Sequence, residues 1–270
     1  MRKTIAALAL VAILHGCAGA QFALPQLSDA EISRTALAIS GDTSGLQRHA
    51  RTDQEYRELL QRVSNRLRLA APPLCTHAGV SSCYFNVHYV GEDVVNAYAS
   101  AGNEIVVYRG LLQYLETEDE IAAAVSHEIG HHLAEHIEEK QENALVGSIL
   151  AGVLMGALLA ATGTQSPSYD PEANQRLVRD SMQIGAAVGA LSYSKEQERE
   201  ADLLGAYLLA RAGYDLRKAG QLYDILARMN RERTHSGWFD THPAGPERIV
   251  AWEKAVAEVE ASPDKLPREE

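Results

Sequence analysis

The chain is short of basic residues and of aromatic side chains. It has 25 Lys and Arg against 36 Asp and Glu, which gives a formal net charge of −11, and the basic residues form no stripe. This pattern argues against nucleic acid as the main partner, and we expect none. Hydrophobic residues make up 46% and charged residues 23% of the 270, so the chain is not wholly disordered and can bury a full core. With no internal repeat and no second boundary, one domain over residues 31–260 is expected.

Cysteine is also scarce, and the first of the three cysteines follows an apparent export signal. Two basic residues precede an apolar run that is too short for a permanent membrane span, which is the layout of a secretory signal. Leu14-His15-Gly16-Cys17 resembles the lipobox of bacterial lipoproteins, although His15 departs from the usual small residue. We therefore predict a signal peptide over 1–16, acylation of Cys17 and a lipid-anchored tether over 17–30. The alternative is a plain signal peptide that is cut nearby.

The same features predict a location. With Ala18 rather than Asp after the cysteine, we expect the periplasmic face of the bacterial outer membrane, with membrane lipid as a partner through the N-terminal acyl chain. Cys75 and Cys83 close a short loop, and in an oxidising periplasm they favour a disulfide. A metal site that includes His77 is the weaker alternative, because no second pair of ligands stands nearby.

Hydrophobic periodicity predicts a mainly helical α+β fold. Residues 28–69 have apolar side chains at helical spacing, and further helices are expected at about 195–212 and 215–230. The alternating, β-branched segments 83–90 and 104–112 predict two strands joined by residues 96–103. The last residues, 261–270, are expected to be frayed.

A stretch without charge runs from Ala144 to Thr162. Small residues recur at four-residue spacing at Gly152, Gly156 and Ala160, and a similar pattern follows later, which predicts a close helical hairpin over about 144–193. We favour a hairpin buried in the protein over a transmembrane one, because aromatic belts and basic flanks are missing. Contact with lipid is left open.

The segment "AVSHEIGHHLAEHIEEK" contains an H-E-x-x-H pattern at His127, Glu128 and His131. Residues four apart share one helix face, so both imidazoles can hold one ion, and the adjacent glutamate can take a proton from the attacking water. Zinc fits this chemistry. The metzincin extension is excluded, since Ala134 and Ile137 stand where that class needs Gly and His.

The third ligand has candidates in "SKEQEREADLLGAYLL". Glu198 and Asp202 share a helix face, so the first can bind the metal while the second holds a ligand histidine. Glu196 and Glu200 compete by residue type, but only Glu198 is in register with the Ala-Asp pair. A solvated acidic face is the alternative for these glutamates.

Four segments together resemble one known family: "VNAYASAGNEIVVYRGLL", "DEIAAAVSHEIGHHLAEH", "LSYSKEQEREAD" and "DTHPAGPERI". The chain resembles the gluzincin metalloendopeptidases that include HtpX, the CaaX prenyl endopeptidases, BepA and LoiP, and it is most similar to LoiP-like outer-membrane lipoprotein peptidases. Lys195 departs from the Arg that is common in this family. The resemblance implies a zincin-like domain with a small sheet and two metal-binding helices.

The resemblance also implies roles by position. One Zn²⁺ would be bound by His127, His131 and Glu198, with Glu128 as catalytic base and Asp202 supporting the site. His242 would stabilise the oxyanion or occupy the open coordination position, and Arg248 would fix that loop or the transition state. Asn96 and Ala97 would border a cleft in which substrate adds as a strand.

The remaining histidines are interpreted as ordinary. We expect His132 at the surface or just outside the ligand shell and His136 in a structural role. The others, not expected to be ligands, are His49, His77, His88 and His235.

The sequence thus predicts a zinc endopeptidase of the bacterial envelope that hydrolyses misfolded or unassembled envelope proteins. One alternative is a self-inhibited outer-membrane lipoprotein that works mainly as a chaperone or docks on outer-membrane assembly machinery. Another is a structural or storage zinc protein, against which Glu128 argues, because a structural site has no use for a base.

Overall fold

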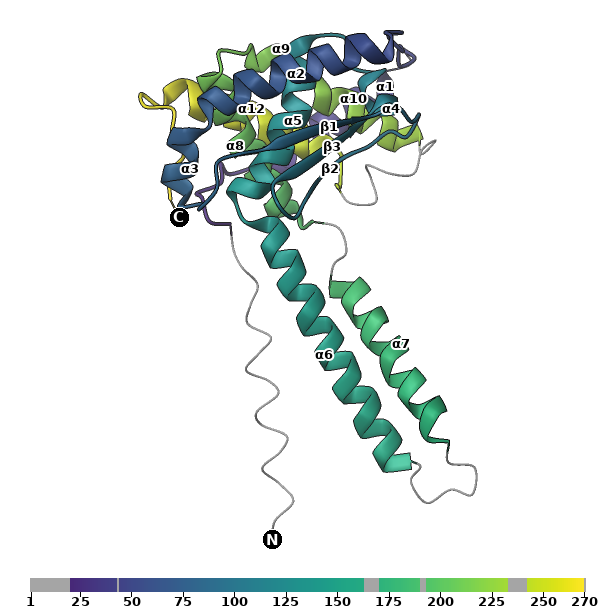
Figure 1. The fold of residues 1–270 in the computed structure, drawn as a ribbon. Coiled ribbons are helices and arrows are strands. Elements are labelled where there is room, and N and C mark those ends of the chain that lie inside the picture. The colour runs from purple at the N-terminus through teal and green to yellow at the C-terminus, as the bar shows by residue number, and fades with distance from the viewer. Residues whose placement is uncertain (1–19, 43, 163–169, 190–192, 233–241, 270) are drawn as a thin grey trace.

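A computed structural model describes residues 20–42, 44–162, 170–189, 193–232 and 242–269. The fold is mainly helical with a small three-stranded sheet, which confirms the predicted α+β class (Figure 1). In chain order, the elements before the site are α1 (Asp29–Gly41), α2 (Asp53–Ala70), α3 (Pro72–Ala78), β1 (Asn86–Val90), β2 (Ala97–Ser100), β3 (Glu104–Tyr108) and α4 (Arg109–Leu112). They are followed by α5 (Glu118–Leu133), α6 (His136–Thr162), α7 (Pro171–Gly189), α8 (Lys195–Arg211), α9 (Leu216–Ala219), α10 (Gln221–Glu232) and α12 (Pro246–Ala261).

The sheet has the order β1-β3-β2. β1 pairs with β3 in parallel, with Val87 opposite Ile105, and β2 pairs with β3 antiparallel, with Ala97 opposite Val107. Buried Ile105 and Val107 face the helices. The prediction of two strands was incomplete, because the expected connection over 96–103 contains β2. The turn from β2 to β3 uses the left-handed backbone conformation of Gly102 and Asn103.

Helices α5 and α8 cross at the centre of the molecule. Each begins with a capping box, Thr117 with Glu120 in α5 and Ser194 with Gln197 in α8, so both starts are fixed locally. Gly130 lets the helices touch, since a Cβ there would lie 2.3 Å from the carbonyl oxygen of Ala201. α2 and the sheet pack on α5, and α12 packs on α8, so this crossing is buried on all sides.

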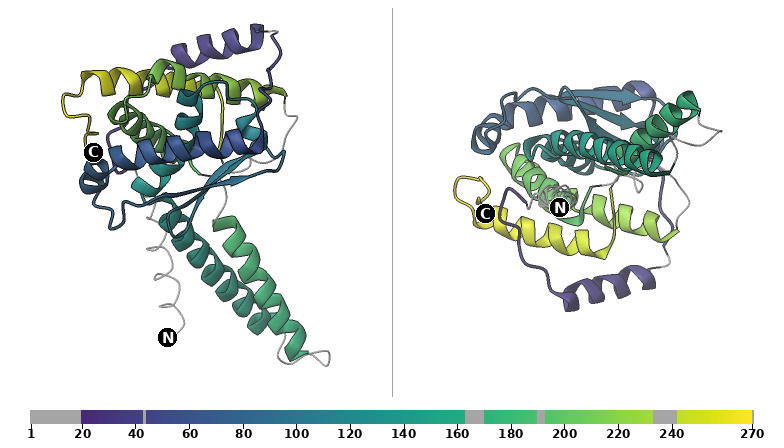
Figure 2. Two further views of the ribbon diagram at one scale, coloured as in Figure 1. Left: turned by 45° about the horizontal axis from the view of Figure 1, so that its top comes forward. Right: turned by 90° about the horizontal axis from the view of Figure 1, so that it is seen from below.

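Helices α6 and α7 do not join this core. They run side by side and project from the domain as a hairpin (Figure 1 and the left view of Figure 2). The prediction of a hairpin buried in the protein was therefore wrong. α6 passes the length and hydropathy test for a membrane span over His136–Ala161, with none of its most apolar window buried. The prediction that small residues bring the two helices close together is confirmed at Gly152, where an added Cβ would lie 2.8 Å from Met182.

Both ends of the described chain are held by the domain. Phe22 is 1% exposed and forms a β-bridge with Glu269, and the Ala23 N–H donates to the Arg268 carbonyl at 2.9 Å. The prediction that the C-terminal residues are frayed is thus wrong for the described residues 261–269, and the predicted tether is attached to the domain from Phe22 onward. The expected signal peptide and Cys17 lie outside the described residues.

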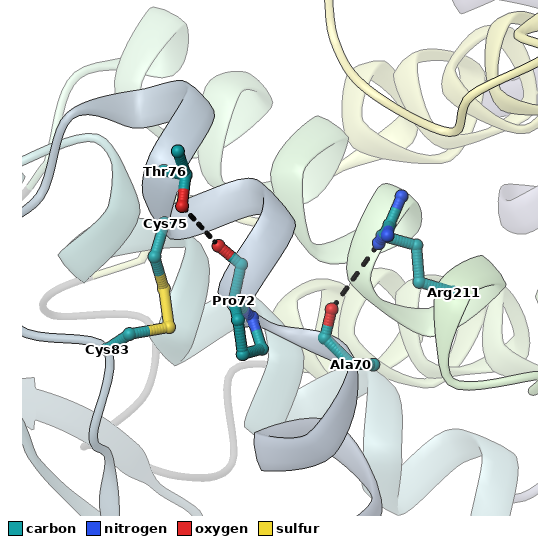
Figure 3. The surroundings of a disulfide bond; sticks show 6 residues. All are labelled: Ala70, Pro72, Cys75, Thr76, Cys83 and Arg211. Carbon is teal, nitrogen blue, oxygen red and sulfur yellow. Dashed lines mark hydrogen bonds between the residues drawn. A yellow bond between two sulfur atoms is a disulfide. The ribbon is translucent and has the colours of Figure 1, made fainter.

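A disulfide joins Cys75 in the middle of α3 to Cys83 before β1, with the sulfur atoms 1.99 Å apart (Figure 3). Cys75 is 3% exposed and belongs to the core. Nearby, Arg211 of α8 donates to the Ala70 carbonyl at 3.4 Å. His77, the alternative metal partner, instead bonds the Pro267 carbonyl through Nε2 at 2.8 Å. The hydrogen bonds of Ala70 and His77 therefore connect the region of α3 to α8 and to the C-terminal segment, and the disulfide connects α3 to the segment before β1.

Candidate metal centre

Three separate segments bring four side chains to one point. α5 supplies His127 and His131 one turn apart, α8 supplies Glu198, and His242 comes from the segment before α12. Their potential ligand atoms lie within 4.8 Å of one another, and all four residues are at most 1% exposed. The structure thus brings together the three predicted ligands and His242.

The distances fit a cation at this point. Nε2 of His127 lies 3.1 Å from Nε2 of His131 and 3.3 Å from Nδ1 of His242. Nδ1 of His242 lies 2.8 Å from Oε1 of Glu198. Imidazole nitrogens and carboxylate oxygens are the donors that zinc accepts, and a cation satisfies several of their lone pairs at once.

Glu128 gives a second, independent sign that the site is built for a bound group. It is 0% exposed, and neither carboxylate oxygen has a hydrogen bond to the described residues. Its Oε1 lies 3.6 Å from Nε2 of His242. A buried carboxylate without such bonds is costly, and a water or substrate group at the cluster relieves that cost.

Asp202 orients His127. Its Oδ1 lies 2.8 Å from Nδ1 of His127, so this ring donates through Nδ1 and presents the Nε2 lone pair to the cluster. Arg248 donates to both carboxylate oxygens of Asp202, at 2.9 and 2.6 Å, and Tyr223 donates its hydroxyl at 2.8 Å. The carboxylate is thereby fixed from three sides.

Arg248 also lies 2.6 Å from Oε2 of Glu198, so one guanidinium neutralises two buried carboxylates. Burial alone would raise the pKa of Glu198, but the charges of His242, Arg248 and His127 outweigh it and hold the pKa well below its usual range. Burial is also the main cause that lowers the pKa of His131, which keeps that ring neutral and able to bind a metal. The carboxylates of Glu198 and Glu128 outweigh burial at His242 and raise its pKa.

His131 has a support of its own, which the sequence analysis missed. Its Nδ1 lies 2.9 Å from Nδ1 of His136, whose Nε2 lies 3.1 Å from Oε2 of Glu200. The other oxygen of Glu200 accepts the Phe22 N–H at 2.8 Å. With Nε2 of His131 at the cluster, its Nδ1–H donates to His136, and His136 donates to Glu200. The structural role expected for His136 agrees with this chain of bonds, but the alternative of a solvated acidic face does not hold for Glu200, because this residue is 2% exposed.

Two further residues differ from expectation. Tyr193, which the sequence analysis did not single out, stacks on His131 with 3.8 Å between ring centroids, and the Lys140 ammonium lies 3.9 Å from the centre of its ring. Burial, with the charges of Glu128 and Glu198, raises the pKa of Tyr193. Of the two positions expected for His132, the surface one is wrong, because His132 is buried against Phe85, and burial lowers its pKa.

Asn96 and Ala97 lie where β2 begins, at the edge of the sheet. Ala97 is fully buried, and the Asn96 carbonyl accepts the Tyr108 N–H at 3.1 Å. Oδ1 of Asn96 is buried without a hydrogen bond to the described residues. β2 packs on α5 and, among the described strands, pairs with β3 alone, so the proposed cleft residues stay a prediction.

Residues 58–256 match the profile of Peptidase family M48. Mitochondrial metalloendopeptidase OMA1 of Arabidopsis thaliana is 29% identical over 236 residues, which cover 86% of this chain and 44% of that protein. The beta-barrel assembly-enhancing protease of Yersinia pestis is 29% identical over 220 residues, which cover 80% of this chain and 43% of that protein. The chain thus spans less than half the length of these curated relatives.

Proposed function

The chain belongs to Peptidase family M48, whose members are zinc metallopeptidases, and from this we propose that it is a zinc-dependent endopeptidase of the bacterial cell envelope. We place it on the periplasmic face of the outer membrane, anchored by an acyl chain on Cys17. Its substrates would be misfolded or unassembled envelope proteins. The apparent signal over 1–16 and the similarity to beta-barrel assembly-enhancing proteases support this location.

The observation that carries the proposal is the position of Glu128. This carboxylate is fully buried, has no hydrogen bond to the described residues, and follows His127 directly on α5, with its Oε1 3.6 Å from Nε2 of His242 in the cluster. A structural metal site needs no such group, whereas hydrolysis needs a base beside the metal.

His127, His131 and Glu198 would hold one Zn²⁺. When bound, zinc supplies Lewis-acid chemistry, which polarises the scissile carbonyl and makes water more acidic. Glu128 would take a proton from the attacking water and pass it to the leaving amine. Asp202 keeps His127 in the required tautomer, and Arg248 balances the charge of the carboxylates beneath the site. A substrate strand would add along β2 beside Asn96 and Ala97.

One observation favours a second candidate, a self-inhibited lipoprotein with mainly a chaperone or assembly role. His242 is completely buried and stands in the ligand cluster, 2.8 Å from Glu198. In this position it would compete with substrate for the open side of the metal. Such a protein would work on outer-membrane assembly machinery and cut only after His242 moves.

The first test is cleavage of reduced casein by the purified full-length chain loaded with zinc. Glu128→Gln is expected to lower the rate by about 10²–10⁴-fold while zinc stays bound, and a chelator should abolish cleavage. Full activity of Glu128→Gln would overturn the assignment of the base. A zinc content of zero under all conditions would overturn the proposed function.

The two candidates differ in how they respond to His242→Ala. Self-inhibition predicts that the variant cuts faster than the wild-type chain, whereas a direct catalytic role predicts a slower rate. Envelope integrity in cells that carry Glu128→Gln adds a second distinction, because a chaperone role survives loss of the base and a protease role does not.

A further inference from the structure

The α6–α7 hairpin leaves large apolar side chains uncovered. On α6, Leu145 is 62% and Leu154 is 61% exposed, and on α7 Ile184 is 65% exposed. From Leu145 to Thr162 the chain of α6 has no charged residue. Over such a length, exposed apolar surface in a soluble protein marks a contact site.

The uncovered side chains of α6 do not form one stripe. Leu145 and Leu154 are nine residues apart, so at 3.6 residues per turn they point about 180° apart around the helix. Both are more than half exposed, and Ile149 and Val153 between them are as well. A protein partner that docks on one side would leave much of this surface in water, whereas lipid would cover all of it.

Helix α7 has a different pattern. Its charged side chains and Gln183 recur at helical spacing along one face, and Figure 1 shows that the helix runs beside α6 for its described length. Because these residues are three or four positions apart, they share one stripe, and each is exposed. The stripe, which we call the polar stripe, consists of Glu172, Arg176, Arg179, Asp180 and Gln183.

We propose that the α6–α7 hairpin lies in the interface of a lipid leaflet, with α6 against the acyl chains and the polar stripe of α7 against headgroups and water. A helix pair with one charged face and an otherwise apolar surface has this orientation at a membrane. Crossing the bilayer is disfavoured, since Arg176, Arg179 and Asp180 would then enter hydrocarbon.

The root of the hairpin lies close to the expected lipid anchor. Gln21 lines a surface pocket together with Glu138, Glu139 and Glu142 of α6. Cys17 precedes Gln21 by four positions, so an acyl chain there attaches within about 14 Å of Gln21 at the root. This step rests on the envelope location proposed above, and it places a membrane surface beside the hairpin.

The test measures lipid contact at the hairpin itself. Leu154→Cys in the full-length chain is labelled with a polarity-sensitive dye and mixed with phosphatidylethanolamine–phosphatidylglycerol vesicles that contain spin-labelled lipid. Leu69→Cys on α2, where the native side chain is 81% exposed, is the matched control. The chain without an added cysteine gives the labelling background.

Blue-shifted emission is expected at position 154, with the strongest quenching by spin labels about 5–10 Å below the headgroups, and neither effect at position 69. A dye at Leu158→Cys should lose its quenching when Leu154→Glu is added. Adding Gln183→Glu instead should leave it unchanged, because this places the same charge on the polar stripe.

Other outcomes overturn the inference in distinguishable ways. Co-sedimentation with vesicles without quenching at 154 would leave the membrane anchor standing and reject the role of the hairpin. Absence of co-sedimentation would reject both the membrane anchor and the role of the hairpin. A blue shift that appears without vesicles would assign α6 to contact with a second copy of the chain.

Discussion

Two glutamates of α8, only two positions apart, contact different histidines, one pair on α5 and one at the start of α6. Glu198 faces the cluster with His127 and His131, whereas Glu200 bonds His136 behind it. Each potential metal-binding imidazole of α5 is therefore connected to a carboxylate. His127 bonds Asp202 directly, and His131 reaches Glu200 through the ring of His136. Such partners orient the ligand and set its tautomer.

Removing the second of these carboxylates should weaken metal binding. Glu200→Ala is expected to reduce zinc affinity by about 10–100-fold, because His136 loses its acceptor and no longer fixes His131. Competition with a chromophoric chelator measures the change, and the absorption spectrum of the cobalt-substituted protein reports ligand geometry. Glu196→Ala, an exposed neighbour on the same helix, is the control. Equal affinities of the two variants would contradict the role of Glu200.

His242 should make the metal-free protein sensitive to alkali. Its pKa is raised from the ordinary 6.5 because Glu198 and Glu128 outweigh burial. The stabilisation from the protonated ring is therefore complete below the unfolded pKa and is lost as pH rises through the folded one. Thermal unfolding of the wild type and of His242→Gln, without metal, should differ most at acid pH and converge as pH rises. A difference that widens with pH would refute this.

At the scale of elements, the site depends on how closely α5 and α8 approach. Gly130 stands between the two histidines of α5 where the carbonyl of Ala201 touches the helix. Gly205 does the same from α8, since a Cβ there would lie 3.2 Å from the backbone of Ser126. The small residues thus set the distance across which Glu198 reaches the histidines.

A methyl group at this crossing should force the helices apart. Gly130→Ala would place a Cβ 2.3 Å from backbone oxygen, which cannot rotate away. Overpacking of this kind costs about 1–3 kcal/mol, and we expect weaker zinc binding together with a lower free energy of unfolding. Denaturant titration and the chelator assay measure both. Gly156→Ala in α6, which meets nothing within 4 Å, should leave both unchanged or gain slightly in helix stability. Similar losses in the two variants would rule out the close approach as the cause.

The elements that sequence patterns could predict were those with strong local signals. Capping boxes and apolar periodicity locate α5 and α8, and residues four apart on a helix share a face, so His127 and His131 could be assigned as a pair. Glu198 could be added because it is in register with the Ala-Asp pair that follows it and matches the family resemblance. β2 was missed because Ala97 and Ala99 have little strand preference, and the strand exists through its pairing with β3.

The remaining differences come from contacts between distant segments. Small residues at four-residue spacing fit a buried hairpin and a projecting one equally well, so Gly152 could not decide between them. Glu200 looks like any exposed acidic residue until Phe22, 178 positions away in the chain, donates to it. The inward position of His132 likewise depends on Phe85 from another element.

At the scale of the whole molecule, the two ends of the described chain close on each other beside the hairpin. Phe22 pairs with Glu269, and its ring stacks on His77 with 5.8 Å between centroids. His77 in turn bonds Pro267, so the N-terminal segment, α3 and the C-terminal segment form one contact. The chain ends thereby support the outer side of Glu200.

Deleting residues 263–270 should break this contact and expose Phe22 to water. Loss of the backbone partner of Ala23 and exposure of the Phe22 ring are expected to lower the free energy of unfolding by about 1.5–3 kcal/mol. Amide exchange should accelerate over residues 20–26, and zinc affinity should fall in the same direction as in Glu200→Ala. Arg268→Ala is the control, because Arg268 bonds Ala23 through its backbone and its side chain is mostly exposed. Unchanged exchange at Phe22 after the deletion would contradict the prediction.

An acyl chain on Cys17 would make Phe22 the point at which mechanical force enters the domain. Tension on the tether would act first on the Phe22–Glu269 bridge and on the hydrogen bond from Phe22 to Glu200. From Glu200 the load would pass through His136 to His131, three hydrogen bonds from the tether to a side chain of the metal centre. A pull too weak to unfold the domain would still strain this path, so zinc retention would depend on how hard the membrane and a bound substrate pull against each other.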